Sequence, residues 1–395
     1  MTWPTVRLDE ISEINPRLGD ALAERDVISF LGMADISELG FTNSGTSRPY
    51  SDVKKGYTSF ADGDLLFAKI TPCFENGKIA QAQLDHQVGF GSTEFHVIRA
   101  DNARANPRYL LHFIRGPEAR LAGKRRMTGS GGQQRVPASF LHSMEVPLPP
   151  LCEQRRIATI LDQADQLVTK HRRALGLLDE LRDSIFDDMF GAEARRAAGA
   201  PSMTLGAHIL DYQNGIYKIR SDYGSGTEIL RIGDFRNGER SRLDVQRRVL
   251  VSKSEVEKFT LAPGDIVVNR VNAMTHVGKA ALIVTRSEPL IYESNMMRVR
   301  VDTRTLLPEY VIQWLTTAPA LNQIRDAAKQ AINQASINQT DVANLSLWVA
   351  PIQRQQTFVD RIAPVAEARR ALMARAVALD ELFASLQNRA FRGEL

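Results

Sequence analysis

The chain repeats itself at one fixed spacing. Gly63-Asp64-Leu65 returns as Gly264-Asp265-Ile266, which is 201 positions later (264 − 63 = 201). The same spacing holds for four further segments: Gly77-Lys78 and Gly278-Lys279, Pro107 and Pro308, Gln154 and Gln355, and Leu178-Asp179-Glu180-Leu181 and Leu379-Asp380-Glu381-Leu382. A repeat this long is not the unit of roughly 20–50 residues that builds a solenoid. It predicts a duplicated domain plus connector, approximate internal two-fold symmetry, and a target with two similar halves.

Composition sets broad limits. A length of 395 residues fits two or three soluble domains. The net charge of +4 and pI near 9.0 are compatible with nucleic acid but weak as evidence for it. Two cysteines, Cys73 and Cys152, form no disulfide framework and suggest a reducing, cytoplasmic location. The sequence shows neither a signal-peptide pattern nor a run of about 18 apolar residues that could span a membrane.

Short strands and helices alternate in each repeat, which predicts an α+β (mixed α/β) domain. We expect four parts: a first domain at 1–150, a long helix at 151–191, a linker and second domain at 192–351, and a distal long helix at 352–395. Predicted strands in the first domain are Val27 to Met33, Asp64 to Ile70, Lys78 to Ala82, Phe95 to Arg99 and Met144 to Leu148. Those in the second are Ile229 to Ile232, Asp265 to Val271, Ala280 to Val284 and Met296 to Val301. Short helices are expected near Pro107 and Pro308.

The two long helices, Glu153 to Phe190 and about Arg354 to Phe391, carry apolar residues at heptad spacing. The predicted seam comprises Ile157, Leu161, Ala164, Val168, Leu175, Leu178, Ile185 and Met189 in the first helix, and Phe358, Val365, Leu372, Leu379 and Leu386 in the second. Each helix would be roughly 55 Å long, too long for its own domain, so we expect them to pack on each other. Pro364 should kink the second helix or mark its effective start.

The run Val146-Pro147-Leu148-Pro149-Pro150-Leu151-Cys152-Glu153-Gln154-Arg155-Arg156-Ile157 resembles the signature PLPPLxEQxxI of the specificity (S) subunits of type I restriction–modification systems. The last ten residues, Leu386 to Leu395, also resemble the end of that family. The second copy departs from the pattern, because Trp348 to Gln355 lacks one proline and the glutamate. Order, length and motif agree over essentially the whole chain.

The resemblance implies a non-catalytic DNA-recognition subunit whose two helices form an antiparallel coiled coil. Each domain would read one half of a bipartite, asymmetric DNA site. Two adenine methyltransferase subunits would bind the chain and bring S-adenosylmethionine, so the chain itself would hold no cofactor. Endonuclease/translocase subunits would join where the system restricts DNA.

Catalytic patterns are weak. Asn106-Pro107-Arg108-Tyr109 partly matches the Asn/Asp-Pro-Pro-Tyr/Phe motif of amino-methyltransferases, but its repeat reads Leu307-Pro308-Glu309-Tyr310, so a helix start is the better interpretation. We find no Gly-rich cofactor loop and no Cys/His cluster with metal spacing. Two alternatives to the specificity subunit stay open: a duplicated DNA-recognition scaffold of another phage-defence complex, and a free-standing adenine methyltransferase.

Two loops in each domain hold residue types that suit phosphate contact or base reading. Candidates in the first loop, after the Gly-Asp strand, are Lys69, Thr71, Glu75, Asn76 and Lys78, and in the second copy Asn269, Arg270, Asn272, Thr275, His276 and Lys279. Candidates in the second loop are Lys124, Arg125, Arg126, Thr128, Ser130, Gln133, Gln134 and Arg135, and in the second copy Lys329, Gln330, Asn333, Gln334, Ser336 and Asn338. Lesser candidates are Tyr217, Lys218 and Arg48 to Tyr50. The alternative interpretation is that these are ordinary solvated loops.

Some apolar residues of the first long helix fall outside the predicted seam. Ile160, Leu167, Leu177 and Phe186 are therefore candidates for contact with a methyltransferase subunit. The arginine pairs Arg155-Arg156, Arg172-Arg173 and Arg369-Arg370 are compatible with solvated helix faces.

Overall fold

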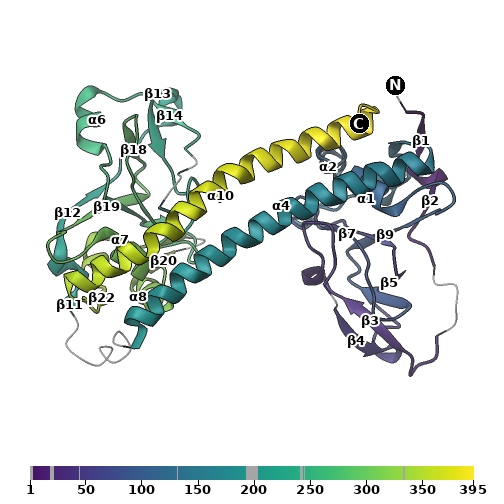
Figure 1. Ribbon diagram of the computed structural model, residues 1–395, viewed down its shortest axis with the longest axis horizontal. Coiled ribbons are helices and arrows are strands. Elements are labelled where there is room, and N and C mark those ends of the chain that lie inside the picture. Colours follow the sequence, from purple (N-terminus) through teal and green to yellow (C-terminus); the bar gives the residue numbers. More distant parts are fainter. Residues whose placement is uncertain are drawn as a thin grey trace. The chain divides into compact units, whose positions relative to one another are not determined.

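A computed structural model describes residues 3–17, 22–43, 45–130, 132–192, 203–240, 243, 245–331 and 334–395. The chain forms two compact units (Figure 1). Unit 1 comprises Met1–Arg173 and Ala374–Leu395, and unit 2 comprises Ala174–Met373. The chain passes between the units twice, each time inside a long helix: α4 (Leu151–Phe186) and α10 (Ile352–Arg392).

Unit 1 is built on two four-stranded sheets. The first sheet has the order β2-β9-β6-β7, with all neighbours antiparallel. The second has the order β4-β3-β8-β5, in which β3 and β8 are parallel. The strands are β2 (Ser12–Ile14), β3 (Val27–Leu31), β4 (Thr46–Pro49), β5 (Thr58–Ala61), β6 (Leu65–Ala68), β7 (Ile79–Gln81), β8 (Val88–Gly91) and β9 (Phe95–Ala100). A separate pair joins β1 (Thr5–Arg7) to β10 (Glu145–Pro147), and the helices are α1 (Pro107–Ile114), α2 (Pro117–Arg125) and α3 (Ala138–His142).

Unit 2 repeats this plan. Its main sheet has the order β12-β19-β15-β17, and a second sheet has the order β14-β13-β18 with β13 and β18 parallel. The strands are β12 (Ile209–Asn214), β13 (Tyr223–Leu230), β14 (Arg248–Val249), β15 (Ile266–Asn269), β17 (Ala280–Leu282), β18 (Leu290–Tyr292) and β19 (Met296–Val301). The pair β11 (Met203–Thr204) and β22 (Ser346–Leu347) matches β1 and β10, and the helices are α6 (Lys253–Phe259), α7 (Pro308–Leu315), α8 (Ala318–Ala327) and α9 (Gln339–Ala343).

The predicted repeat is therefore a repeat of topology. Gly63 and Gly264 both adopt positive φ, +84° and +89°, in the turn that starts the central strand of each main sheet. In both units the aspartate that follows is buried and paired with an arginine of the neighbouring strand: Asp64 with Arg99, and Asp265 with Arg300, each at 2.7 Å. The prediction of two homologous mixed α+β domains with long helices is confirmed.

Most predicted strands lie within one or two residues of their expected bounds, and both proline-started helices are present. One loop prediction was wrong: Lys329 to Ser336 forms two strands, β20 (Lys329–Ala331) and β21 (Gln334–Ser336). The prediction that Pro364 could mark the start of the distal helix was also wrong, because α10 begins at Ile352 and contains Pro364.

The long helices pack antiparallel in each unit. In unit 1, Arg156 Nη2 donates to Leu395 O at 2.7 Å, and Arg172 pairs with Asp380 at 3.1 Å. In unit 2, Arg369 pairs with Asp179 at 2.9 Å, and Arg361 with Asp188 at 3.5 Å. Residue numbers in α10 fall as those in α4 rise. A π-helical turn, η4 (Asp187–Gly191), extends α4.

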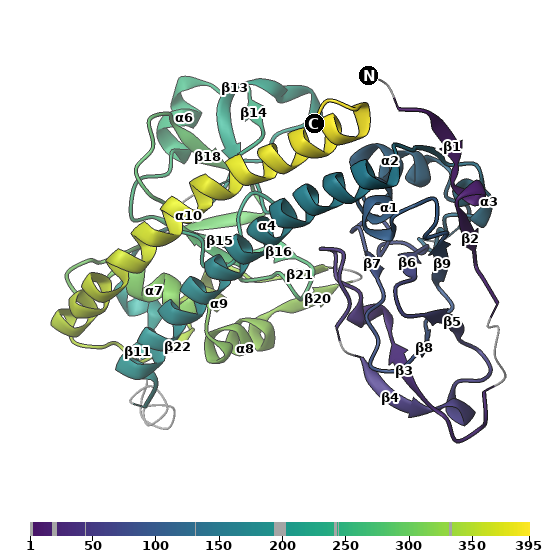
Figure 2. The same ribbon diagram turned by 45° about the vertical axis from the view of Figure 1, so that its right-hand side comes forward.

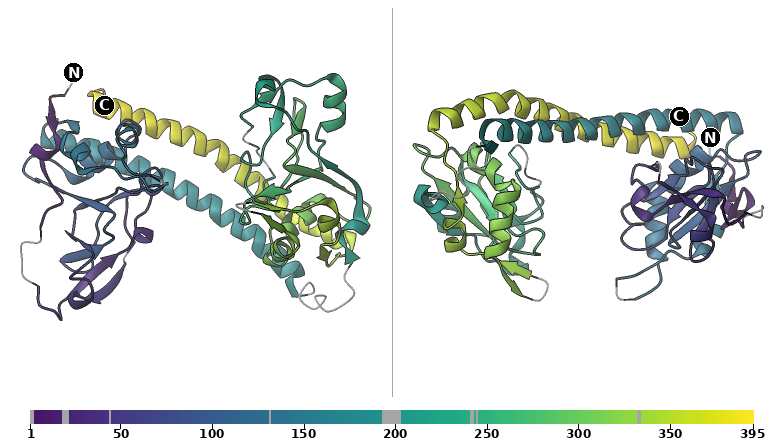
Figure 3. Two further views of the ribbon diagram at one scale, coloured as in Figure 1. Left: turned by 180° about the vertical axis from the view of Figure 1, so that it is seen from behind. Right: turned by 90° about the horizontal axis from the view of Figure 1, so that it is seen from below.

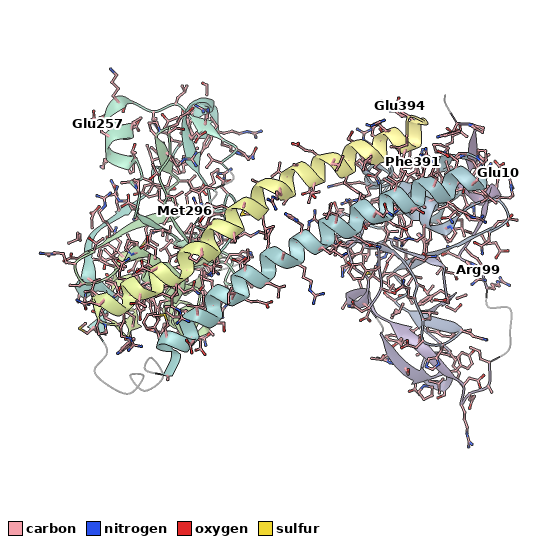
Figure 4. All side chains as sticks on the ribbon, in the orientation of Figure 1. Glu10, Arg99, Glu257, Met296, Phe391 and Glu394 are labelled. Atoms are coloured by element: carbon pink, nitrogen blue, oxygen red, sulfur yellow. The ribbon has the colours of Figure 1, made fainter. Side chains whose placement is uncertain are left out.

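Aromatic residues fasten each helix end to its domain. In unit 1, Phe391 lies near the end of α10 (Figure 4). Its ring lies 5.4 Å from that of Tyr109 and 5.1 Å from that of Phe113, both on α1. Trp3 Nε1 donates to Ala390 O at 3.3 Å, so residues near both chain ends meet in unit 1 (Figure 3). In unit 2, Phe190 lies 5.0 Å from Tyr310, the repeat of Tyr109.

Candidate nucleic-acid interface

The two predicted loops of unit 1 are joined by backbone hydrogen bonds. Thr71 N donates to Gln134 O, and Val136 N donates to Lys69 O, both at 2.9 Å. Thr128 and Arg135 exchange backbone bonds at 2.8 and 2.9 Å, which closes the second loop on itself. Segments more than sixty positions apart in sequence therefore form one edge of the domain.

The matching segments of unit 2 are joined more regularly. The strand β16 (Val271–Asn272) pairs with β21, which pairs with β20, in a three-stranded antiparallel sheet. Ile337 N donates to Arg270 O at 2.9 Å, the repeat of the Val136–Lys69 bond. The β20–β21 hairpin projects from the body of the unit (Figure 2).

Many predicted DNA-contacting residues are exposed on these edges. In unit 1 the exposed candidates are Asn76, Arg125, Arg126, Thr128, Ser130, Gln133 and Gln134. In unit 2 they are Tyr217, Thr275, His276, Lys329, Gln330, Gln334 and Asn338. Partly buried candidates are Lys69, Thr71, Lys78, Arg135, Lys218, Arg270, Asn272 and Lys279. Asn333 lies outside the described residues.

Two lysines with matching positions serve their own domain. Lys78 Nζ donates to Met33 O at 2.8 Å, and Lys279 Nζ donates to Phe235 O at 2.9 Å and to Ile232 O. Burial lowers the pKa of Lys279, against a smaller opposing effect of Asp234. These ammonium groups tie the Gly-Lys turn to the segment that follows β3 in unit 1 and β13 in unit 2, so the structure gives them an internal role that the sequence pattern did not reveal.

Other candidates also have partners inside their domain. Arg135 pairs with Glu94 at 2.8 Å, and Lys218 pairs with Glu255 at 2.9 Å. Asn338 Oδ1 accepts from Asp341 N at 3.0 Å and so caps α9. Asn269, named for the first loop, is fully buried, and its amide has no hydrogen-bond partner among the described residues. It cannot reach DNA in this conformation.

The exposed amides are among the side chains left to face a ligand. Gln133 and Gln134 in unit 1 and Gln330 and Gln334 in unit 2 are exposed, and no side-chain hydrogen bond to another described residue is present at any of them. Amide groups can donate to and accept from an adenine edge at once. Sequence reasoning passed over Arg220, Arg247 and Arg248, which gather near β13 and β14 because of the strand pairing.

One predicted partner-contact residue is corrected. Phe186 is buried, with its ring 5.2 Å from that of Phe190 and 5.4 Å from that of Tyr310, so it belongs to the core of unit 2. Ile160 is half-buried, whereas Leu167 and Leu177 are 48% and 53% exposed. Only the last two present a large apolar surface.

The described residues place no three His, Cys, Asp or Glu side chains where they could hold a metal ion. None of their helices has the length and apolarity needed to cross a membrane.

The sequence is similar to known proteins. The family described as the type I restriction modification DNA specificity domain matches residues 1–175. The chain is 39% identical over 189 residues to the specificity subunit of the type I restriction enzyme EcoAI from Escherichia coli, an alignment that covers 46% of this chain and 32% of that relative. The chain thus spans about a third of that relative's length.

A longer alignment covers both domains. The chain is 25% identical over 335 residues to the specificity subunit of StySPI from Salmonella potsdam, covering 81% of this chain and 72% of that relative. Among solved structures, the crystal structure of a type I restriction–modification system S subunit from M. genitalium superposes with a TM-score of 0.57 at 12% identity, over 99% of this chain and 96% of that one. At this identity the likeness shows the fold.

Proposed function

Because the chain belongs to the family of type I restriction–modification specificity subunits, we propose that it is the non-catalytic subunit that selects the DNA site of such a complex. The domains at 1–150 and 192–351 each read one half of a bipartite site. The helices at 151–191 and 352–395 connect the domains.

One observation carries the proposal. In each unit, two segments rich in DNA-compatible side chains are hydrogen-bonded into a single edge whose exposed residues include two glutamines. The edges share a backbone plan but differ in side chains and in regularity. Each base pair presents a distinct pattern of hydrogen-bond donors and acceptors in the major groove. Two domains with the same backbone but different contact residues should therefore recognise different half-sites, which makes the whole site asymmetric.

The partners follow from this role. DNA methyltransferase subunits bind exposed apolar positions of α4, Leu167 in unit 1 and Leu177 in unit 2, and these subunits carry S-adenosylmethionine. Restriction subunits join where the system cleaves DNA. The net charge of +4 is small for 395 residues, and phosphate contacts supply most non-specific affinity. The lone chain should therefore bind DNA weakly, and specific binding should need the assembled complex.

The test uses the full chain assembled with its methyltransferase and measures methylated adenines across a genome. Gln133→Ala with Gln134→Ala should relax one half-site, and Gln334→Ala the other, because a bidentate amide–adenine contact contributes about 1–3 kcal/mol of discrimination. Gln356→Ala, on the exposed face of α10, is the matched control and should leave the site unchanged. If every variant methylates the wild-type site with unchanged sequence preference, the assignment of these two edges to base recognition is wrong.

A further inference from the structure

An open pocket of about 460 Å³ lies beside β13 and β14 in unit 2. Its charged lining consists of three arginines, Arg220, Arg247 and Arg248, and one carboxylate, Glu228. None of these residues belongs to the projecting hairpin or to the loop joined to it. The pocket is therefore a second polar feature of the same domain.

The positive charge of this pocket is only partly balanced. Glu228 is shared between Arg248 at 3.4 Å and Arg286 at 2.5 Å, and Glu288 takes a second bond from Arg248 at 2.7 Å. Arg220 and Arg247 are exposed and form no ion pair with any residue that the structure describes. Two guanidinium groups thus face the pocket without a counter-charge, and guanidinium donors suit phosphate oxygens.

The backbone beside the pocket is shaped for close approach. Strand β13 bulges between Tyr223 and Thr227, which both lie opposite Val249. Gly224, which lines the pocket, has φ +130°, and a Cβ there would meet no atom within 4 Å. A ligand can therefore approach the chain closely at this position, as glycine allows. Gly226 has φ +97°, and its Cβ would lie 2.4 Å from Val249 O, so the bulge needs glycine there.

Exposed apolar side chains lie close to the arginines in sequence. Tyr217 is 76% exposed, and Ile219 and Leu250 are each 56% exposed. Leu250 N donates to Asp222 O at 2.8 Å, which holds the Leu250 strand end against the short helical turn that begins at Arg220. Exposed apolar groups next to cationic ones fit the alternating sugar and phosphate chemistry of a nucleic-acid backbone.

We propose that this pocket binds a backbone phosphate of the DNA, with Arg220 and Arg247 donating to it, at a place separate from the bases read by the hairpin. The inference rests on the proposed function and adds a sequence-independent contact to it. Arg248, held by two carboxylates, keeps β14 in place beside the site. The contact fixes the position of the second domain on the duplex without contributing to base choice.

The test compares Arg220→Gln, Arg247→Gln and the double variant with the wild type, each assembled with the methyltransferase. DNA affinity is measured against salt concentration on the wild-type site and on a site with one altered half. Each lost phosphate contact should reduce the salt slope by about 0.9, and affinity should fall by the same factor on both DNAs. Arg304→Gln is the control, because Arg304 is 85% exposed, lies outside the pocket and carries the same charge.

Three outcomes overturn the inference while leaving the proposed function intact. The arginine variants could keep the wild-type salt slope, they could change half-site preference as Gln334→Ala should, or Arg304→Gln could reduce the slope equally. Binding of inorganic phosphate that is lost in the double variant, with DNA affinity unchanged, would assign a free-anion site instead. Absence of any specific DNA binding by the wild-type complex would overturn the proposed function as well.

Discussion

Asp162 shows how single residues join a domain to the helix that carries it. Its carboxylate accepts from Arg108 Nη2 at 2.5 Å and from His112 Nε2 at 2.7 Å, both on α1. Burial raises the pKa of Asp162, but the hydrogen bonds from His112 and Arg108 outweigh it and hold the pKa at about 2. His112 Nδ1 has no partner among the described residues and burial lowers its pKa, so the ring is neutral with its proton on Nε2.

The pKa of Asp162 predicts an acid-dependent contribution to stability. Because the folded pKa lies below the ordinary 3.8, the contribution is complete above pH 4 and is lost as the pH falls toward 2. Asp162→Asn should lower the free energy of unfolding by about 1–2 kcal/mol at pH 7, since the group is only a quarter exposed. Urea unfolding between pH 7 and 3 measures it, and the gap between variant and wild type should narrow below pH 4.

Glu24→Gln provides the matched control for this measurement. Glu24 pairs with Lys54 at 2.6 Å, but the two side chains are 72% and 40% exposed, and exposed pairs contribute little. An Asp162→Asn effect no larger than that of Glu24→Gln, or one that does not depend on pH, would refute this account.

Residue type alone could indicate which positions are able to contact DNA. It could not show which of these side chains are already buried or hydrogen-bonded within their own domain. Gln133 and Lys78 looked equivalent in sequence, yet one is exposed and the other donates to Met33 O. Asn269 lies in a polar run and is nonetheless fully buried. The bond of Lys78 reaches a residue 45 positions away in sequence, and Asn269 is buried within the main sheet of unit 2, and local patterns report neither.

At the scale of elements, one glutamine in each repeat joins domain to helix. Gln154 Oε1 accepts from Asn106 N at 2.8 Å, and its Nε2 donates to Arg104 O and Pro149 O. Gln355 does the same with Leu307 N, Thr305 O and Ala350 O. Both side chains are fully buried. The glutamine of the signature motif thus forms three hydrogen bonds that join the start of each long helix to its domain. We call this set of three bonds the glutamine clamp.

Gln154→Ala and Gln355→Ala should therefore each destabilise their own unit. Either change leaves one N–H and two carbonyls without partners in a buried site, which costs roughly 2–4 kcal/mol. Amide hydrogen exchange should report faster exchange in α1 for the first variant and in α7 for the second. Gln133→Ala, on an exposed loop, should alter neither. Equal protection from amide exchange in the wild type and in the two glutamine variants would contradict the stabilising role of these glutamines.

Elements with strong local signals could be predicted, and those that depend on pairing could not. Strand β19 matches its expected bounds of Met296 to Val301, because apolar and charged residues alternate from Met297 to Val301 just after a turn. The hairpin β20–β21 was missed because Lys329, Gln330 and Gln334 are poor strand formers. Strand β21 pairs with β16, which lies more than fifty positions earlier, and β20 pairs in turn with β21.

At the scale of the whole molecule, the connections between the units are helical. The chain crosses from unit 1 to unit 2 within α4 and returns within α10, and each unit has its own hydrophobic cores. If the units read separate half-sites, the paired helices set the spacer between them. Helix length should then control spacer length without affecting base choice.

Lengthening both helices tests this relation. Four residues inserted after Leu178 in α4 and four after Leu372 in α10 add ~6 Å to each, and ~6 Å is about two base pairs of DNA at 3.4 Å each. Four residues also complete nearly one helical turn, so the packed faces should stay aligned. Mapping methylated adenines should show unchanged half-sites with a longer spacer. Gln334→Ala is the converse control, since it should change a half-site and keep the spacer. Altered half-sites with an unchanged spacer in the insertion variant would show that the length of the helices does not determine the length of the spacer.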